Sequence, residues 1–141
     1  MNETVAVLGP GRIGRQIGLA FALGGWRVLM VDLKERPAGE ARSVFADCRR
    51  EIARDVRLMT EEEVIAAADG RDALERIEDH VGLAGIGECS FIQEALPESF
   101  ALKREVLGRL AGKVKPEAIV ASTSSTISPS YLVDAVDGPD R

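Results

Sequence analysis

The stretch from Thr4 to Gly14 reads Thr-Val-Ala-Val-Leu-Gly-Pro-Gly-Arg-Ile-Gly. Its first five residues are apolar or β-branched, which predicts a buried strand over Thr4 to Leu8. The glycines and proline that follow favour a turn. From Ile13 to Leu23 the apolar residues recur at spacings of three and four, which is the period of a helix. We therefore predict a strand, a tight turn and a helix.

The glycines of this turn follow the pattern Gly-x-Gly-x-x-Gly, at Gly9, Gly11 and Gly14. Between a strand and a helix, the first glycine permits the turn, the second lets a pyrophosphate approach the backbone, and the third allows close packing. The free amides of the first helical turn, which contains Arg12 and Ile13, favour an anion. The pattern therefore predicts a dinucleotide site, and its alternative interpretation is an ordinary glycine turn.

A second apolar run, from Trp26 to Val31, ends at Asp32. A carboxylate at the end of the second strand can accept hydrogen bonds from an adenosine ribose and repels a 2′-phosphate, so it favours NAD over NADP. Asp32 is also a common kind of turn residue at the end of a strand. Lys34 and Arg36 follow closely and could attract a 2′-phosphate, so NADP stays open as an alternative.

The rest of the chain alternates helical and extended patterns. We expect one long helix in the charged segment that begins at Glu35, and a second helix capped by Thr60. A last helix is expected after Ser128, and another at Pro97. Further strands are expected over residues 76–79, 89–95 and 118–121. This order predicts an α/β fold: a doubly wound (Rossmann) parallel sheet of about five strands, with helices on both faces and a helical insertion after the second strand.

Length and composition limit the classes of function. The 141 residues fit one domain, 1–141, and the net charge of −5 argues against nucleic-acid or anionic-membrane partners. No apolar run approaches the roughly 18 residues that a membrane span needs, so we expect a cytoplasmic protein with a small-molecule substrate. Cys48 and Cys89 lack the spacing of a zinc site and are expected to be buried thiols; no metal is predicted.

Three segments together resemble a known family. They are Val7–Gly14, Phe91–Glu98 with Lys103, and Ala121–Thr126. They are similar to the N-terminal NAD-binding domain of the 3-hydroxyacyl-CoA dehydrogenase family, and the resemblance covers nearly the whole chain. The segment from Ser128 to Leu132 resembles most the branch that holds lambda-crystallin, L-gulonate 3-dehydrogenase and carnitine 3-dehydrogenase.

The resemblance implies roles for single residues. Glu98 and Lys103 match family positions that contact the cofactor near its nicotinamide ribose, and Ser125 matches a serine that hydrogen-bonds the 3-hydroxyl of the substrate. Simpler interpretations exist. An acid in the first turn of a helix and a lysine one turn later are common by charge preference alone, and hydroxyl side chains often only satisfy a turn.

The resemblance also implies a catalytic base. In the family, a histidine one strand beyond the serine-rich loop takes the proton of the hydroxyl, and a helical domain completes the pocket and the dimer. The single histidine here, His80, lies near the predicted third strand instead. We therefore expect an NAD-dependent, homodimeric dehydrogenase as the parent protein, and expect residues 1–141 to bind NAD without turnover. A non-catalytic, crystallin-like module is the alternative.

The long helical segment departs from the family. Members that act on CoA thioesters carry a serine and a lysine there, and an ungapped count places Cys48 and Asp55 at those positions. This departure favours a smaller 3-hydroxy acid over a 3-hydroxyacyl-CoA as substrate.

Overall fold

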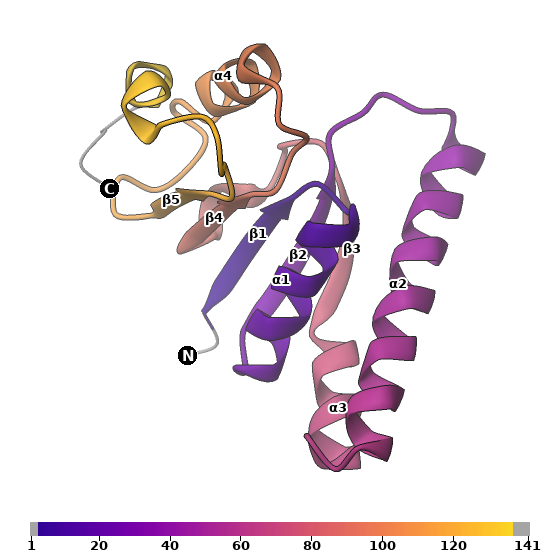
Figure 1. The fold of residues 1–141 in the computed structure, drawn as a ribbon. Helices are drawn as coiled ribbons and strands as arrows, with labels where there is room; N and C mark the ends of the chain where they lie inside the picture. The colour runs from indigo at the N-terminus through magenta and orange to yellow at the C-terminus, as the bar shows by residue number, and fades with distance from the viewer. Residues whose placement is uncertain (1–2, 137–141) are drawn as a thin grey trace.

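A sheet of parallel strands in the order β3-β2-β1-β4-β5 lies at the centre of the computed structural model, which describes residues 3–136 (Figure 1). The strands are β1 (Thr4–Leu8), β2 (Arg27–Asp32), β3 (Ile77–Val81), β4 (Phe91–Glu94) and β5 (Ile119–Ser122). The chain builds outward from β1 to β3, then crosses to the other side of β1 for β4 and β5. The predicted doubly wound sheet of five strands is therefore confirmed.

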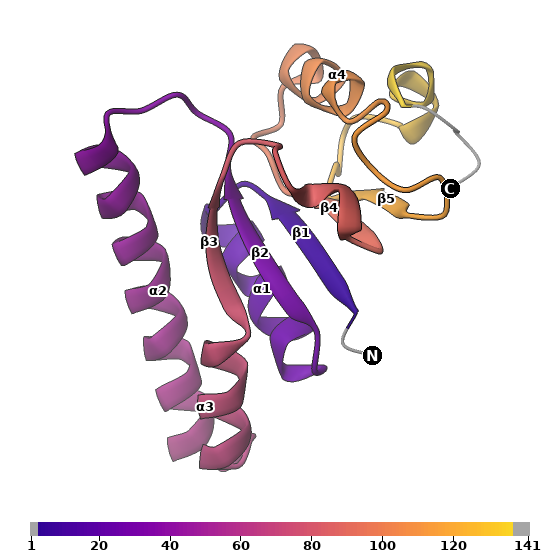
Figure 2. The ribbon, with the colours of Figure 1, turned by 180° about the vertical axis from the view of Figure 1, so that it is seen from behind.

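Helices lie around this sheet (Figure 2). The α-helices are α1 (Arg12–Leu23), α2 (Ala38–Glu61), α3 (Ala67–Glu75) and α4 (Phe100–Arg109). Three short 3-10 turns complete the described elements: η1 (Ile86–Glu88), η2 (Pro129–Tyr131) and η3 (Val133–Ala135).

Alternate residues of the same strands bury the two faces of the sheet. In β1, Val5 and Val7 pack with buried side chains of α1, α2 and α3, whereas Ala6 and Leu8 pack with those of α4 and η1. This division follows from the period of two in a strand. Because both faces are covered, the strand reads as one continuous apolar run.

The two cysteines belong to different halves of this core. Cys48 lies in the cluster on the α1 side and Cys89 in the cluster on the α4 side. Both are free and buried, as the sequence predicted. Burial raises the pKa of each thiol to about 11, and since the thiolate is the reactive form, neither side chain is suited to a nucleophilic role.

The turn between β1 and α1 brings helix and strand unusually close. Gly9 has a φ of +112°, a backbone region that side chains disfavour, and its amide donates to the carbonyl of Val31 at 2.9 Å. A Cβ placed on Gly14 would lie only 1.9 Å from the carbonyl oxygen of Gly9. The sequence therefore needs glycine at both positions for α1 to begin directly above β1.

The predicted helix start near Thr60 is wrong. α2 runs through Thr60, and α3 begins only at Ala67. The hydroxyl of Thr60 donates a 2.8 Å hydrogen bond to the carbonyl of Val56 in the preceding turn of α2, so it caps no new helix. The chain reverses instead at Glu63, which has a φ of +57°.

The helix expected at Pro97 begins later. α4 starts at Phe100, and Ser99 is its N-cap, with its hydroxyl oxygen accepting from the amide of Leu102 at 3.4 Å. A capping hydroxyl satisfies one of the free amides of the first turn, which proline cannot do. The four residues between β4 and Ser99 are thereby left outside the helix.

The α-helix expected after Ser128 is not formed among the described residues. The 3-10 turns η2 and η3 occupy this segment instead. Pro129 does lie at the start of η2, but the hydroxyl of Ser128 hydrogen-bonds that of Ser130 at 2.8 Å, so no side chain caps the turn. Without a capping side chain, the free amides of the first turn lack a partner, and this disfavours a longer helix.

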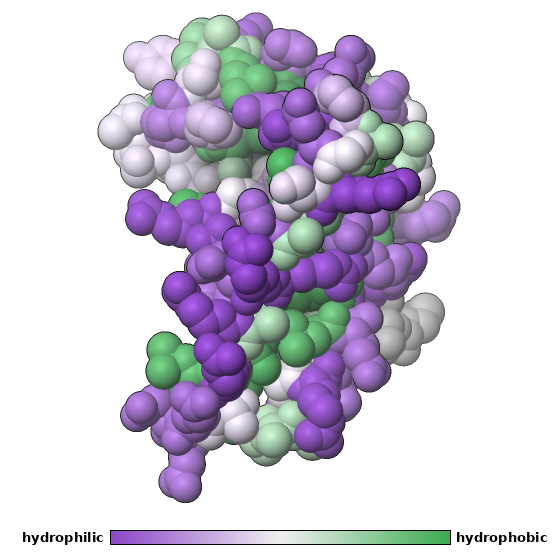
Figure 3. Space-filling model, turned by 90° about the vertical axis from the view of Figure 1, so that its right-hand side faces the viewer, coloured by the Kyte–Doolittle hydropathy of each residue, from purple (hydrophilic) through white to green (hydrophobic). Residues whose placement is uncertain are grey.

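The outer side of α2 is mostly hydrophilic, and an apolar patch interrupts it in the lower part of the view (Figure 3). Its arginines pair with neighbouring acids along α2, among them Arg50 with Asp47 at 2.8 Å and Arg54 with Glu51 at 3.3 Å. These arginines form a solvated face. Within residues 3–136, every helix is too short or too polar to cross a lipid bilayer.

The glycine turn yields a test of the fold. Gly14→Ala should lower the free energy of unfolding by about 3 kcal/mol, because the new methyl group overlaps the carbonyl of Gly9. Gly11→Ala is the matched control, since nothing lies within 4 Å of a Cβ there, and it should stay within about 1 kcal/mol of the parent. Urea unfolding followed by circular dichroism measures both. Equal losses of stability in the two variants would show that the close approach of α1 to β1 at Gly14 does not limit stability.

Candidate functional site

The carboxyl ends of four strands meet at one edge of the sheet. Leu8 of β1 is in register with Val31 of β2 and with Glu94 of β4, and Glu94 is in register with Ser122 of β5. Asp32 follows Val31 as the last residue of β2. The chain order reverses between β1 and β4, and doubly wound sheets bind ligands at this point.

An open cleft of about 560 Å³ lies above this edge. Most of the predicted site residues on β1, α1 and β2 line it, together with the loop after β5: Gly9, Gly11, Arg12, Ile13, Asp32 and Thr123. The cleft has the size typical of ligand pockets. The fold therefore brings most of the site residues that were predicted on β1, α1 and β2 into one cleft.

The floor of the cleft suits an anion. The space where a Cβ of Gly11 would lie is open, with nothing within 4 Å, so a ligand can approach the backbone there. The first turn of α1 contains no acidic residue, and its amides have no partner within the helix. This end of α1 therefore offers unopposed positive charge, which fits the pyrophosphate of a dinucleotide.

Asp32 is held at the side of the cleft. Its side chain is 4% exposed, and one oxygen accepts from Arg36 Nε at 2.7 Å. The other oxygen accepts from the amide of Lys34 at 3.2 Å. Each carboxylate oxygen can accept a second hydrogen bond, so Asp32 is oriented by its neighbours and retains capacity for a ribose.

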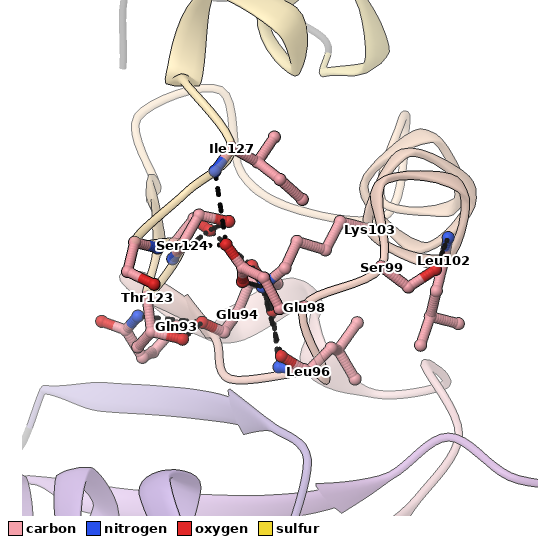
Figure 4. Close-up of polar contacts among 12 residues, drawn as sticks. Gln93, Glu94, Leu96, Glu98, Ser99, Leu102, Lys103, Thr123, Ser124 and Ile127 are labelled. Carbon is pink, nitrogen blue, oxygen red and sulfur yellow. Dashed lines mark hydrogen bonds and ion pairs between the residues drawn. The ribbon is translucent and has the colours of Figure 1, made fainter.

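A charged network lies at the ends of β4 and β5 (Figure 4). Glu94 and Lys103 are both 0% exposed, and Lys103 Nζ contacts both carboxylate oxygens of Glu94 at 3.0 Å. Lys103 Nζ also donates to the carbonyl of Leu96 at 3.2 Å and pairs with Glu98 at 3.3 Å. The network joins β4 to α4 inside an otherwise apolar core.

Glu98 extends this network to the loop after β5. One of its oxygens accepts from the amides of Ser125, Thr126 and Ile127 at 3.2, 3.0 and 3.3 Å, and from the hydroxyl of Thr126 at 2.9 Å. These hydrogen bonds, first those from Thr126, lower the pKa of Glu98 to about 2; Lys103 contributes in the same direction. Glu98 is therefore ionised at neutral pH and fixes the loop.

Ser125 presents its hydroxyl to solvent on this loop. The residue is exposed, and its hydroxyl makes no hydrogen bond to any residue among 3–136. Ser122 and Thr123 differ, because their hydroxyls donate to the side chain and to the backbone carbonyl of Glu94. Ser122 also accepts from the amide of Ser124 at 3.1 Å. The hydroxyls of Ser122 and Thr123 therefore serve hydrogen bonds within the protein.

His80 lies far from this loop. It belongs to β3, which is one edge of the sheet, whereas β5 is the other edge. Its Nε2 is 2.6 Å from the carbonyl oxygen of Ala84. The fold therefore separates the single histidine from Ser125 by the full width of the sheet.

Glu94 is a site residue that was not predicted from the sequence. The signal was present, because an acid inside the apolar segment from Phe91 to Ala95 has to be paired if the strand is buried. The segment alone does not say which cation pairs with it. Arg36, predicted only as a possible ligand of a 2′-phosphate, pairs with Asp32 in the structure.

The pKa of Glu98 predicts how its contribution to stability depends on pH. Its folded value of about 2 lies below its ordinary value of 4.5, so its stabilisation is complete above about pH 4.5 and is lost as the pH falls through 2. We expect Glu98→Gln to lower the free energy of unfolding at pH 7, and expect the difference from the parent to shrink between pH 4.5 and 2. Urea titrations at pH 7, 4.5 and 3 measure it. A difference independent of pH would contradict the assignment.

Comparison with known proteins gives this geometry a family. Residues 4–141 match the model of the 3-hydroxyacyl-CoA dehydrogenase NAD binding domain. The chain is 33% identical over 141 residues to the 3-hydroxybutyryl-CoA dehydrogenase of Bradyrhizobium diazoefficiens, covering 99% of this chain and 45% of that protein. It is 31% identical over 145 residues to the fatty acid oxidation complex subunit alpha of Psychrobacter sp., covering 100% of this chain and 18% of that protein. The chain spans less than half the length of both relatives.

A solved structure agrees with the fold. The 3-hydroxybutyryl-CoA dehydrogenase of Escherichia coli superposes with a TM-score of 0.86 at 20% identity, covering 99% of this chain and 28% of that chain. The family match, in contrast, rests on the sequence itself and extends over almost every residue. The glycine turn, the acid at the end of β2 and the loop after β5 are thus parts of an NAD-binding domain, and the chain belongs to the 3-hydroxyacyl-CoA dehydrogenase family.

Proposed function

We propose that this polypeptide is the cofactor-binding part of a dehydrogenase that transfers a hydride between NAD and the C3 hydroxyl of a 3-hydroxy acid or 3-hydroxyacyl-CoA. The observation that carries the proposal is the shared strand edge, where the turn at Gly11, the carboxylate of Asp32 and the loop of Ser125 all lie. The relatives named as dehydrogenases of 3-hydroxybutyryl-CoA support the reaction class.

One half of the site would hold the adenosine and the pyrophosphate. Gly9 would permit the turn and Gly11 would let the pyrophosphate approach it, and the amides of Arg12 and Ile13 would face the pyrophosphate with the positive end of α1. Asp32, oriented by Arg36, would accept the hydroxyls of the adenosine ribose. Gly14 acts by packing, since it lets α1 approach β1.

The other half would hold the nicotinamide end and the substrate. Glu98 and Lys103 lie beside the loop of Ser125, and the exposed hydroxyl of Ser125 would hydrogen-bond the 3-hydroxyl of the substrate. NAD supplies the hydride acceptor there when bound. A proton acceptor is also needed, and an imidazole suits neutral pH. Because His80 lies at the opposite edge of the sheet, we infer that the base comes from outside residues 1–141.

The choice between a 3-hydroxy acid and a 3-hydroxyacyl-CoA as substrate is a separate part of the proposal. Cys48 is 3% exposed and packs in the core, and Asp55 is hydrogen-bonded by the side chain of Gln16. Both side chains are engaged within the protein, which supports a smaller 3-hydroxy acid and the branch that holds L-gulonate and carnitine 3-dehydrogenases. The names of the relatives favour a CoA thioester instead. A cytoplasmic location and a homodimeric parent protein stay predictions from the sequence.

The proposal predicts binding without turnover. Titration of residues 1–141 with NADH in a calorimeter should give saturable heat. Addition of NAD with 3-hydroxybutyrate or 3-hydroxybutyryl-CoA should give no rise in absorbance from NADH, since the base is missing from the site. Absence of saturable binding would contradict the cofactor site, and turnover would contradict the inference about the base.

Asp32 should set the preference between the two cofactors. The unsubstituted polypeptide of residues 1–141 should bind NADH at least about tenfold more tightly than NADPH, because the carboxylate repels a 2′-phosphate. Asp32→Ser should reduce that ratio to about one or below, since it removes the repulsion and releases Arg36 from its 2.7 Å ion pair. Fluorescence titrations with both reduced cofactors measure the ratio. The exposed Asp69→Ser is the control, and an unchanged ratio in Asp32→Ser would refute this role.

A further inference from the structure

The hydrogen-bonding capacity of Lys103 is used within the protein. Its ammonium group contacts both oxygens of Glu94 at 3.0 Å, the carbonyl of Leu96 at 3.2 Å and an oxygen of Glu98 at 3.3 Å. An ammonium group has only three N–H donors, and Lys103 is 0% exposed. Lys103 therefore has no donor left for a ligand unless it gives up one of these contacts.

Glu94 is the centre of this network. Besides Lys103, it accepts hydrogen bonds from the amide of Leu96 and from the hydroxyl of Ser122. It is itself 0% exposed. A buried charge that loses its partner is costly, so Glu94 and Lys103 depend on each other inside the core. Glu94 lies at the last position of β4, below the loop that follows β5.

Glu98 is where the network reaches the surface, with a side chain that is 35% exposed. One of its oxygens faces Lys103, and the other accepts from the backbone amides of residues 125–127. The side chain of Glu94 is thus connected to the loop of Ser125 through Lys103 and Glu98 (Figure 4) and directly through the hydroxyl of Ser122. The backbone carbonyl of Glu94 also accepts from the amide and the hydroxyl of Thr123.

We propose that Glu94 is a positioning residue for the nicotinamide end of the site. It acts through Lys103, which orients Glu98, and through Ser122, which anchors the start of the loop. This inference rests on the proposed function, because it assumes that the nicotinamide end lies beside Glu98 and Ser125. Among residues 3–136, no hydrogen bond or ion pair joins Gly11 or Asp32 of the adenosine end to the side chains of this network.

The test compares two ligands that share one end. ADP carries the adenosine and the two phosphates, and NADH adds the second ribose and the nicotinamide. Glu94→Gln should weaken NADH binding about tenfold, the loss expected for one hydrogen bond to a charged group, and should leave ADP binding within about twofold. A merely structural role for Glu94 would lower the melting temperature but would not separate the two ligands. The exposed Glu117→Gln is the matched control and should change neither affinity.

Amide exchange gives a readout that does not need a ligand. In Glu94→Gln the amides of Ser125, Thr126 and Ile127 should exchange faster by NMR, while those of β1 keep the rate of the parent protein. Equal exchange at the three loop amides in both proteins would overturn the proposal, as would equal weakening of NADH and ADP. Absence of NADH binding by the unsubstituted polypeptide would instead overturn the proposed function. Failure of the proposal about Glu94 and failure of the proposed function are therefore distinguishable.

A double variant covers the case in which Glu94→Gln does not fold. Glu94→Gln with Lys103→Met removes both buried charges, so neither is left unpaired in the core. The double variant should bind ADP as the parent does, keep the fast exchange at residues 125–127 and still bind NADH about tenfold more weakly. NADH affinity equal to that of the parent would overturn the proposal.

Discussion

The close approach of α1 to β1 is the constraint on which the candidate site depends. No side chain fits between them at Gly14, because a Cβ there would lie 1.9 Å from the carbonyl oxygen of Gly9. This approach places the first turn of α1 directly above the end of β1. The neighbouring strand β2 ends in Asp32, so the amides of the helix and the carboxylate line one cleft. Backbone packing therefore holds this half of the site.

Charge holds the other half. The core on both faces of the sheet is apolar, and within the described residues Glu94 and Lys103 are the two charged residues with 0% exposure. They are tolerated there because each satisfies the other and because backbone groups use the remaining hydrogen-bonding capacity. Glu98 links Lys103 to the backbone amides of residues 125–127 at the surface. The two halves of the site thus depend on different physical interactions, and substitutions in one half can leave the other intact.

The elements that the sequence predicted well are those with a strong local pattern. The strand from Thr4 to Leu8 agrees with its prediction, and so does the helix that ends at Leu23, because a continuous buried run or a regular apolar stripe allows few alternatives. The predictions that depended on one hydroxyl group were wrong. Thr60 bonds back into α2, and Ser128 bonds Ser130. A serine or threonine has several local partners, and the surrounding backbone decides among them.

The sequence by itself determined the fold class, the glycine turn and the family, because these are written in local periodicity and in contiguous motifs. It also indicated Gly11, Asp32 and Ser125 as site residues, but not Glu94. Only the tertiary structure decided how the charged residues pair: Lys103 with Glu94 and Glu98, Asp32 with Arg36, and His80 at the far edge of the sheet. The physical reason is that an ion pair in the interior depends on burial and on the spatial meeting of β4, α4 and β5, and neither follows from the local pattern of any one segment.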